Sequence, residues 1–290
     1  MYSIKDLERL SGHKAHTIRI WEKRYELLEP KRTDTNIRYY DDDQLRKILN
    51  VSTLLAHGGK ISKISKLKEI EIAEAVEQLM APTSTDDRND AFINRIIEAS
   101  MTYDEQLFEG AFAAATLRLG LNKCYALVVL PALIRLGLMW GKNTLMPAQE
   151  HFISNLIKQK LFAAIDGLPA PDNASKKYLL FLPEKEEHEI GLLFANYLIK
   201  QRGHLSYYLG QNVPSVNLEA AIHDVQPDYI LLFMVRTWNK EEAKELFGKL
   251  NDAYKNKPIL LCGSSQPLNH IESNKHLIKI NKIEDLYPHI

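Results

Sequence analysis

The sequence predicts a multidomain protein with three parts: an all-α module that carries a two-stranded ribbon, a four-helix bundle, and an α/β unit built on a parallel sheet. Residues 1–168 repeat apolar side chains at helical spacing, with one polar interruption. Residues 176–290 instead alternate short apolar runs with amphipathic helical runs, which is typical of a parallel sheet with helices on both faces. A chain of 290 residues is long enough for two or three domains.

The composition narrows the class of protein. The chain is 45% hydrophobic and has no net charge, but its first forty residues hold more basic than acidic side chains. No run of about 18 uncharged apolar residues occurs, so we expect no membrane span. The start, MYSIKDLERL, lacks the features of a secretory signal. Cys124 and Cys262 are too few for a disulfide framework, which favours a reducing cytoplasm. No Cys/His cluster has zinc spacing.

Two polar stretches indicate where the parts join. The segments APTSTDDRND (81–90) and LPAPDNASKK (168–177) combine Pro, Ser, Asn and Asp, which favours linkers. We therefore expect domains at residues 1–75, 90–168 and 176–290.

The first part contains two short helical segments joined at Ser11-Gly12-His13. The second segment directs Ile18, Trp21 and Leu28 toward a core, and its outward residues are basic or hydrogen-bonding. This arrangement is typical of a helix-turn-helix with its recognition helix. The next residues, EPKRTDTNIRYYDDDQL, predict a two-stranded wing with its bend near Asp34-Thr35-Asn36, and then Asp41 as the N-cap of a helix.

A local basic face of this kind is typical of nucleic-acid-binding proteins, and a small helical domain with ordinary surface charge is the alternative. The segment IRIWEKRYELLEPKRTDTNIRYYDDDQLRKI resembles the MerR family of transcriptional regulators at WEKRY, LLEP and RYY. The resemblance implies dimeric binding to a two-fold operator. Pattern and resemblance together give these candidate DNA contacts: His16, Thr17, Arg19, Lys23, Arg24, Arg32, Arg38 and Tyr39.

The middle part predicts four helices packed as a bundle, because LFEGAFAAATLRLG and CYALVVLPALIRLGLMWG keep small and apolar residues at helical spacing. The last part predicts a Rossmann-like (flavodoxin-like) parallel sheet, with HLIKI as a candidate fifth strand. Its expected strands are 178–182, 204–208, 228–234 and 258–262, and its expected helices are 188–201, 215–224 and 240–252.

The turn EKEEHEIG lies between the first strand and the first helix of this last part, and it contains Glu186, His188 and Gly191. Doubly wound sheets bind ligands at the carboxyl ends of their strands. A neutral imidazole is a good metal ligand, and a carboxylate two residues earlier can fix its tautomer. Glycine permits close approach of a ligand to the helix start. A solvated loop histidine is the alternative, and the spacing His-x-x-Gly by itself does not separate the two.

The spacing Glu-x-His-x-x-Gly resembles that of cobalamin-binding Rossmann-like domains, and YYLGQNVP resembles the turn after their second strand. Trp140, followed nine residues later by Glu150-His151, resembles the bundle of CarH/LitR-type light-sensing MerR regulators. The resemblance implies that His188 ligates cobalt, while Trp140, Glu150 and His151 cap the upper face of the cobalamin around its 5′-deoxyadenosyl group. Taken singly, Trp140 reads as a core residue and Glu150-His151 as an exposed helix start.

Three positions depart from that family's pattern. The family carries a serine two residues before Val235 to receive the nucleotide tail, and Phe233 stands there in this chain. A large ring overfills such a slot and weakens binding. The family's Gly-Gly falls on Gly263-Ser264, and the histidine expected after the bundle tryptophan is Gly141, which argues against a bis-histidine state.

These patterns predict a cytoplasmic, non-enzymatic, DNA-binding transcriptional regulator, a repressor, that senses a cobalamin (adenosylcobalamin or methylcobalamin) and through adenosylcobalamin responds to light. The predicted partners are double-stranded promoter DNA and further copies of the chain, in a dimer or tetramer. Two alternatives stand beside this hypothesis. The first is a ligand-independent regulator of the same architecture with a degenerate corrin site, and the second is a corrinoid carrier for methyl transfer.

Overall fold

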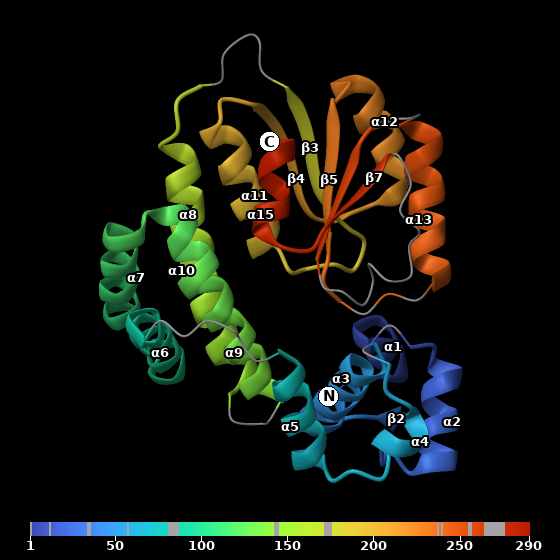
Figure 1. Cartoon of the computed structure of the whole chain (residues 1–290). Coiled ribbons are helices and arrows are strands. Elements are labelled where there is room, and N and C mark those ends of the chain that lie inside the picture. The colour runs from blue at the N-terminus through green and yellow to red at the C-terminus, as the bar shows by residue number, and fades with distance from the viewer. Residues whose placement is uncertain are drawn as a thin grey trace. The chain divides into compact units, whose positions relative to one another are not determined.

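The computed structural model describes the chain except residues 1, 12, 34–35, 57, 81–86, 142–144, 171–175, 237, 239, 255–256 and 264–275. The described residues form two compact units, Met1–Ile157 and Lys158–Ile290. The first unit is helical apart from a small ribbon, and the second contains a five-stranded sheet (Figure 1). The helix α10 (Pro147–Asp166) contributes residues to both units.

The amino-terminal part of the first unit is a winged helix-turn-helix, as predicted. Its core buries Ile18, Trp21 and Leu28, which are the residues that the helical pattern directs inward. The proposed bend at Asp34-Thr35 lies outside the described residues, and Asn36 beside it has a positive φ of 65°. The elements are α1 (Ile4–Ser11), α2 (Ala15–Tyr25), the antiparallel strands β1 (Lys31–Arg32) and β2 (Arg38–Tyr39), α3 (Asp42–Ala56), α4 (Ile61–Ile64) and α5 (Glu69–Met80).

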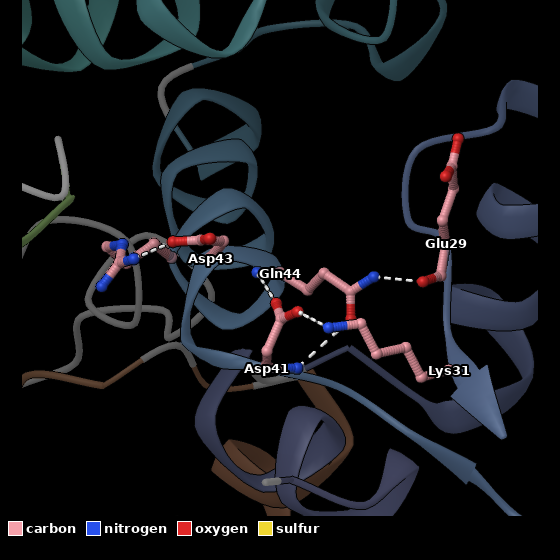
Figure 2. Close-up of polar contacts among 6 residues, drawn as sticks. Glu29, Lys31, Asp41, Asp43 and Gln44 are labelled. Carbon is pink, nitrogen blue, oxygen red and sulfur yellow. Dashed lines mark hydrogen bonds and ion pairs between the residues drawn. The ribbon is translucent and has the colours of Figure 1, made fainter.

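The start of α3 shows why the chain turns from the wing into a helix at this point (Figure 2). Asp41 Oδ1 accepts a hydrogen bond from the backbone N–H of Gln44 at 3.1 Å, and Gln44 Oε1 accepts one from the N–H of Asp41 at 3.3 Å. This reciprocal pair satisfies two N–H groups that a helix start leaves open. Lys31 Nζ on the wing lies 3.2 Å from Asp41 Oδ2, so the cap also ties β1 to α3. The predicted N-cap is confirmed.

The second part of the first unit contains the four helices that the sequence predicts. The helix α6 begins at Asp87, so the linker prediction for residues 81–90 is wrong at its carboxyl end. The acidic and amide residues there form a first helical turn, where negative charge is favourable. The helices are α6 (Asp87–Thr102), α7 (Glu105–Leu119), a continuous span made of α8 (Leu121–Cys124), the π-helical turn η1 (Tyr125–Val129) and α9 (Leu130–Gly141), and then α10.

Among the described residues, the span Leu121–Gly141 is long and apolar enough by composition to cross a membrane, with a mean hydropathy of 1.7. No membrane span is expected from the sequence, which has no uncharged apolar run of about 18 residues; Lys123 and Arg135 lie within this span. The span packs against α6 and α7 and buries Val128 and Leu136 completely. It therefore behaves as the core helix of a bundle.

A buried polar contact joins the bundle to the winged module within the first unit. Asn50 on α3 is 8% exposed, and its Nδ2 donates to the backbone carbonyl of Gly141 at 2.8 Å. A Cβ built on Gly141 would lie 2.8 Å from Asn50 Oδ1, so a side chain at that position would push the Asn50 amide out of its present place. The side chain of Trp140 packs against the core of the winged module, as does Leu138. The carboxyl end of α9 is thus docked on α3.

Replacing Asn50 by Ala is expected to destabilise the first unit by about 1–3 kcal/mol, because it leaves a buried carbonyl without its donor. Urea unfolding followed by circular dichroism measures this loss. Ser52→Ala is the matched control, since Ser52 is equally buried on α3 but donates within its own helix, to the Ile48 carbonyl. Equal loss in the two variants would contradict a specific role of the contact with Gly141.

The second unit is a doubly wound α/β fold with five parallel strands in the order β4-β3-β5-β6-β7. This order is flavodoxin-like, and the candidate fifth strand is confirmed. The strands are β3 (Lys177–Pro183), β4 (Leu205–Val213), β5 (Tyr229–Met234), β6 (Ile259–Gly263) and β7 (Leu277–Ile280). The helices are α11 (Ile190–Gln201), α12 (Ser215–Val225), α13 (Lys240–Ala253), α15 (Ile283–Leu286) and the short η2 (Tyr287–His289).

The helices cover the sheet in two layers (Figure 1). One face packs on α12 and α13 through a core that includes Leu179, Leu232 and Leu246. The opposite layer contains α11, which is almost completely buried from Leu192 to Ile199. Because β4 and β5 lie on opposite sides of β3, the strand order reverses there. The loops after β3 and β5 therefore meet at the switch point, where doubly wound folds bind ligands.

Candidate ligand and nucleic-acid sites

The loop after β3 holds Glu186 completely buried and His188 60% exposed at the side chain. Glu186 Oε1 lies 2.5 Å from His188 Nδ1. Its Oε2 accepts hydrogen bonds from the backbone N–H groups of Val235 and Arg236, which follow β5, at 2.8 and 2.9 Å. One carboxylate thus ties together the two loops of the switch point and fixes the imidazole that projects from them.

The electrostatics of Glu186 suit this role. Burial alone would raise the pKa of the carboxyl, but the hydrogen bond and charge of His188 and the N–H groups of Arg236 and Val235 lower it to about 2. Glu186 is therefore ionised near neutral pH. An ionised carboxylate is an acceptor only, so Nδ1 of His188 carries the proton and Nε2 becomes the ring nitrogen suited to bind a metal.

Glu189 extends the support for this loop. Its Oε1 accepts a hydrogen bond from Tyr208 Oη on β4 at 2.8 Å, and its Oε2 lies 3.4 Å from Lys158 Nζ on α10. Burial and the neighbouring Glu189 raise the pKa of the Tyr208 phenol, which stays a donor. Glu189 directly follows His188, and both of its carboxylate oxygens are held, so the turn that carries the imidazole is fixed on this side as well.

Gly191, in the first turn of α11, is in close contact with Phe233 of β5. A Cβ built on Gly191 would lie 2.6 Å from Phe233 Cε1 and 2.9 Å from Cδ1, closer than real side chains come. The aromatic ring therefore rests directly on the glycine backbone. The glycine that the sequence analysis assigned to ligand approach serves here to admit a ring of the protein itself.

Gly263, at the end of β6, makes a similar approach to the end of β5. It pairs with Met234 in the sheet and has a φ of 141°, and a Cβ there would lie 2.0 Å from the Met234 carbonyl oxygen. Glycine is required at this position by the backbone alone. Val235 contributes its N–H to Glu186. Ser264, the other half of the expected Gly-Gly pair, lies outside the described residues.

The three residues expected to cap the upper face of a cobalamin lie in the first unit. Trp140 packs on the core of the winged module, and its buried Nε1 has no hydrogen-bond partner among the residues that the structure describes. Glu150, near the start of α10, lies 2.9 Å through Oε2 from Nδ1 of His151 and accepts a hydrogen bond from Ser154. The His151 side chain is 73% exposed.

The structure brings four of the predicted DNA contacts to one groove between α2 and the wing: Arg19, Lys23, Arg32 and Arg38. The groove also contains three glutamates, Glu22, Glu26 and Glu29. Arg32 Nη1 donates to Asn36 Oδ1 at 2.6 Å, and Arg24 stacks over Tyr25. The remaining candidates, His16, Thr17, Arg24 and Tyr39, are not among the residues that line this groove.

Sequence reasoning missed Glu22 as a positioning residue. Its side chain is only 8% exposed, and its Oε2 lies 3.6 Å from Nε of Arg38 on the wing. Its Oε1 accepts a hydrogen bond of 2.5 Å from Tyr40 Oη. Burial and then the contact with Glu22 raise the pKa of the Tyr40 phenol. Glu22 thus fixes the wing against α2. The sequence feature that could have indicated this role is a lone acidic residue in an otherwise basic recognition helix.

Comparison with known proteins assigns both parts of the first unit. Residues 2–69 match the MerR HTH family regulatory protein model, and residues 91–164 match the B12 binding domain model. The chain is thus a MerR-type, DNA-binding transcriptional regulator that carries a B12 binding domain.

Two relatives that match most of this chain are named as repressors. The chain is 29% identical to the HTH-type transcriptional repressor CarH of Myxococcus xanthus, over 87% of this chain and 85% of that protein. It is 27% identical to the repressor CarA of the same organism, over 82% and 78%. The monomethylamine corrinoid protein of Methanosarcina barkeri overlays with a TM-score of 0.47 at 15% identity, covering 73% of this chain and 98% of that one.

The residues present fit one half of a corrinoid site. Among the described residues, no group of three or more His, Cys, Asp or Glu side chains could hold a metal ion. His188, oriented by Glu186, would supply the single protein ligand that a corrinoid cobalt needs. The space beside Gly191 does not fit a nucleotide base, because Phe233 fills it.

Proposed function

We propose that this chain is a repressor that binds promoter DNA as a dimer or tetramer in the cytoplasm, and that a corrinoid held at His188 sets its affinity for DNA. The observation that carries the proposal is the buried Glu186 carboxylate, which fixes the exposed imidazole of His188 at the switch point of the sheet. The B12 binding domain match and the repressor names of the relatives support it.

His188 would hold the cobalt, and Glu186 would keep the ring tautomer that coordination needs. Trp140, Glu150 and His151 are proposed to contact the upper axial group; they fall inside the segment that matches the B12 binding domain. When bound, a corrinoid with an adenosyl group supplies a cobalt–carbon bond that light cleaves. No step of turnover is needed, so the chain acts as a regulator and not as an enzyme.

The coupling between corrinoid and DNA follows from linkage. A ligand changes the affinity for DNA only if it binds the DNA-competent state and the other state with different affinities. DNA then changes the affinity for the ligand by the same factor. Gel-shift titration of the protein's own promoter DNA, with and without adenosylcobalamin in the dark and after illumination, tests this. We expect tighter binding with the corrinoid in the dark. Absence of any shift would favour the corrinoid carrier, which has no use for a DNA-reading helix.

A ligand-independent regulator is the second candidate, and Phe233 is the observation that favours it. Its ring occupies space at the switch point that a ligand could otherwise use. DNA binding that is unaffected by any corrinoid, together with a protein that stays colourless after incubation with corrinoids and desalting, would select this candidate.

Replacing Arg38 by Ala is expected to weaken binding to all DNA sequences by about tenfold, and to lower the slope of log K against log salt by about 0.9, the value for one phosphate contact. Arg38 lies on the wing and lines the groove beside α2. Fluorescence anisotropy at several salt concentrations measures both quantities. Lys244→Ala, which removes one exposed cation from α13 in the second unit, is the control. An unchanged slope for Arg38→Ala would exclude a phosphate contact.

A further inference from the structure

The space around His188 is closed on one side by the protein's own atoms. Gly191 stands three residues after His188, at the start of α11, and the ring of Phe233 lies against it. Next to this pair, the Met234 carbonyl is packed on Gly263. The end of β5 therefore lies in close contact with both the first turn of α11 and the end of β6.

The chemistry of corrinoids makes this closure matter. Cobalt in a corrin ring has two axial positions, and in cobalamin the base of an attached nucleotide takes the lower one. If His188 held the cobalt from that side, the base would be displaced and the protein would have to accommodate it near the imidazole. Corrinoids without the nucleotide, such as cobinamides, place no such demand on the protein.

We infer, on the basis of the proposed function, that Phe233 makes this site select corrinoids that lack the lower nucleotide base. The imidazole of His188 offers a cobalt ligand, and Phe233 on Gly191 denies the displaced base the space between β5 and α11. Admitting the base requires moving a packed aromatic ring, which weakens binding by about tenfold or more. Phe233 is thus a specificity-determining residue, and the ligand class is the incomplete corrinoid.

The test compares adenosylcobinamide with adenosylcobalamin, titrated in the dark against the full chain and followed by the visible absorption of the corrinoid. The wild-type chain is expected to bind adenosylcobinamide at least about tenfold more tightly than adenosylcobalamin. Phe233→Ala is expected to reduce this ratio about tenfold by gaining affinity for adenosylcobalamin, with adenosylcobinamide little changed. A second variant, Phe233→Leu, keeps an apolar side chain but removes the flat ring, and is expected to reduce the ratio by less.

Phe247→Ala is the matched control, because Phe247 is partly buried against the core on the other face of the sheet, on α13. It should leave the ratio unchanged. Since the result is a ratio for two ligands in the same protein, a general loss of stability does not imitate it.

The outcomes separate the two proposals. Equal affinities of the wild-type chain for both corrinoids, or a ratio that neither Phe233 variant changes, would overturn the selection while leaving corrinoid sensing in place. Failure of the wild-type chain to bind either corrinoid would overturn both, and would leave the ligand-independent regulator.

Discussion

Replacing His188 by Ala is expected to lower corrinoid affinity by at least about 100-fold and to remove the absorption band shift that marks nitrogen coordination of cobalt. The imidazole is the group that the switch-point loop presents outward, with 60% of its side chain exposed. Its removal also takes one hydrogen bond from the buried Glu186 carboxylate, so we expect a moderate loss of folding stability as well. A thermal melt of the same variant therefore separates the loss of coordination from unfolding.

Visible absorption spectra of the desalted protein measure this loss. His223→Ala is the matched control, since His223 is also a highly exposed histidine, on α12, with a neighbouring carboxylate from Asp224. Added imidazole is expected to restore part of the band shift in His188→Ala by occupying the vacated position. Wild-type affinity in the His188→Ala variant would show that another group holds the cobalt.

Replacing Glu186 by Gln is expected to weaken corrinoid binding by about 10–100-fold, although no ligand atom is removed. An amide that still accepts from the N–H groups of Val235 and Arg236 must direct its NH₂ toward Nδ1 of His188. The imidazole proton is then moved to Nε2, where it blocks coordination. The substitution therefore changes the tautomer of His188 while it preserves the shape of the loop.

Titration with a corrinoid and a thermal melt of the same samples separate coordination from folding. Glu187→Gln, at the exposed neighbouring position, is the control and should bind as the wild type does. Rescue by pH is not expected, because an amide does not ionise. Unchanged affinity in Glu186→Gln would mean that the tautomer is fixed by some other contact.

The fold could be predicted closely from the sequence, because each level of pattern agreed with the next. The alternation of strand and helix patterns predicted the parallel sheet. The apolar stripe through Ile18 and Trp21 predicted the inner face of the recognition helix, and both residues are buried. The error at the start of α6 arose because Asp and Asn occur both in linkers and in first helical turns.

The candidate site was predicted in part. The spacing of Glu186 and His188 predicted that the carboxylate orients the imidazole, and the structure places His188 Nδ1 and Glu186 Oε1 at hydrogen-bond distance. The bonds from Glu186 to Val235 and Arg236 join residues about fifty positions apart, and no local pattern encodes such a distance. The same is true of Glu22 and Arg38, whose contact depends on how the wing folds back on α2.

The joint between Asn50 and Gly141 constrains how this chain can evolve. A side chain at position 141 would meet the amide of Asn50 and displace it from its bond to the backbone, so a histidine gained there would cost the chain this contact. Homologues with a side chain at position 141 are therefore expected to carry a small residue at position 50. The two positions should covary. A lineage that gains a cobalt donor at position 141 is expected to lose the hydrogen bond between Asn50 and the backbone of residue 141.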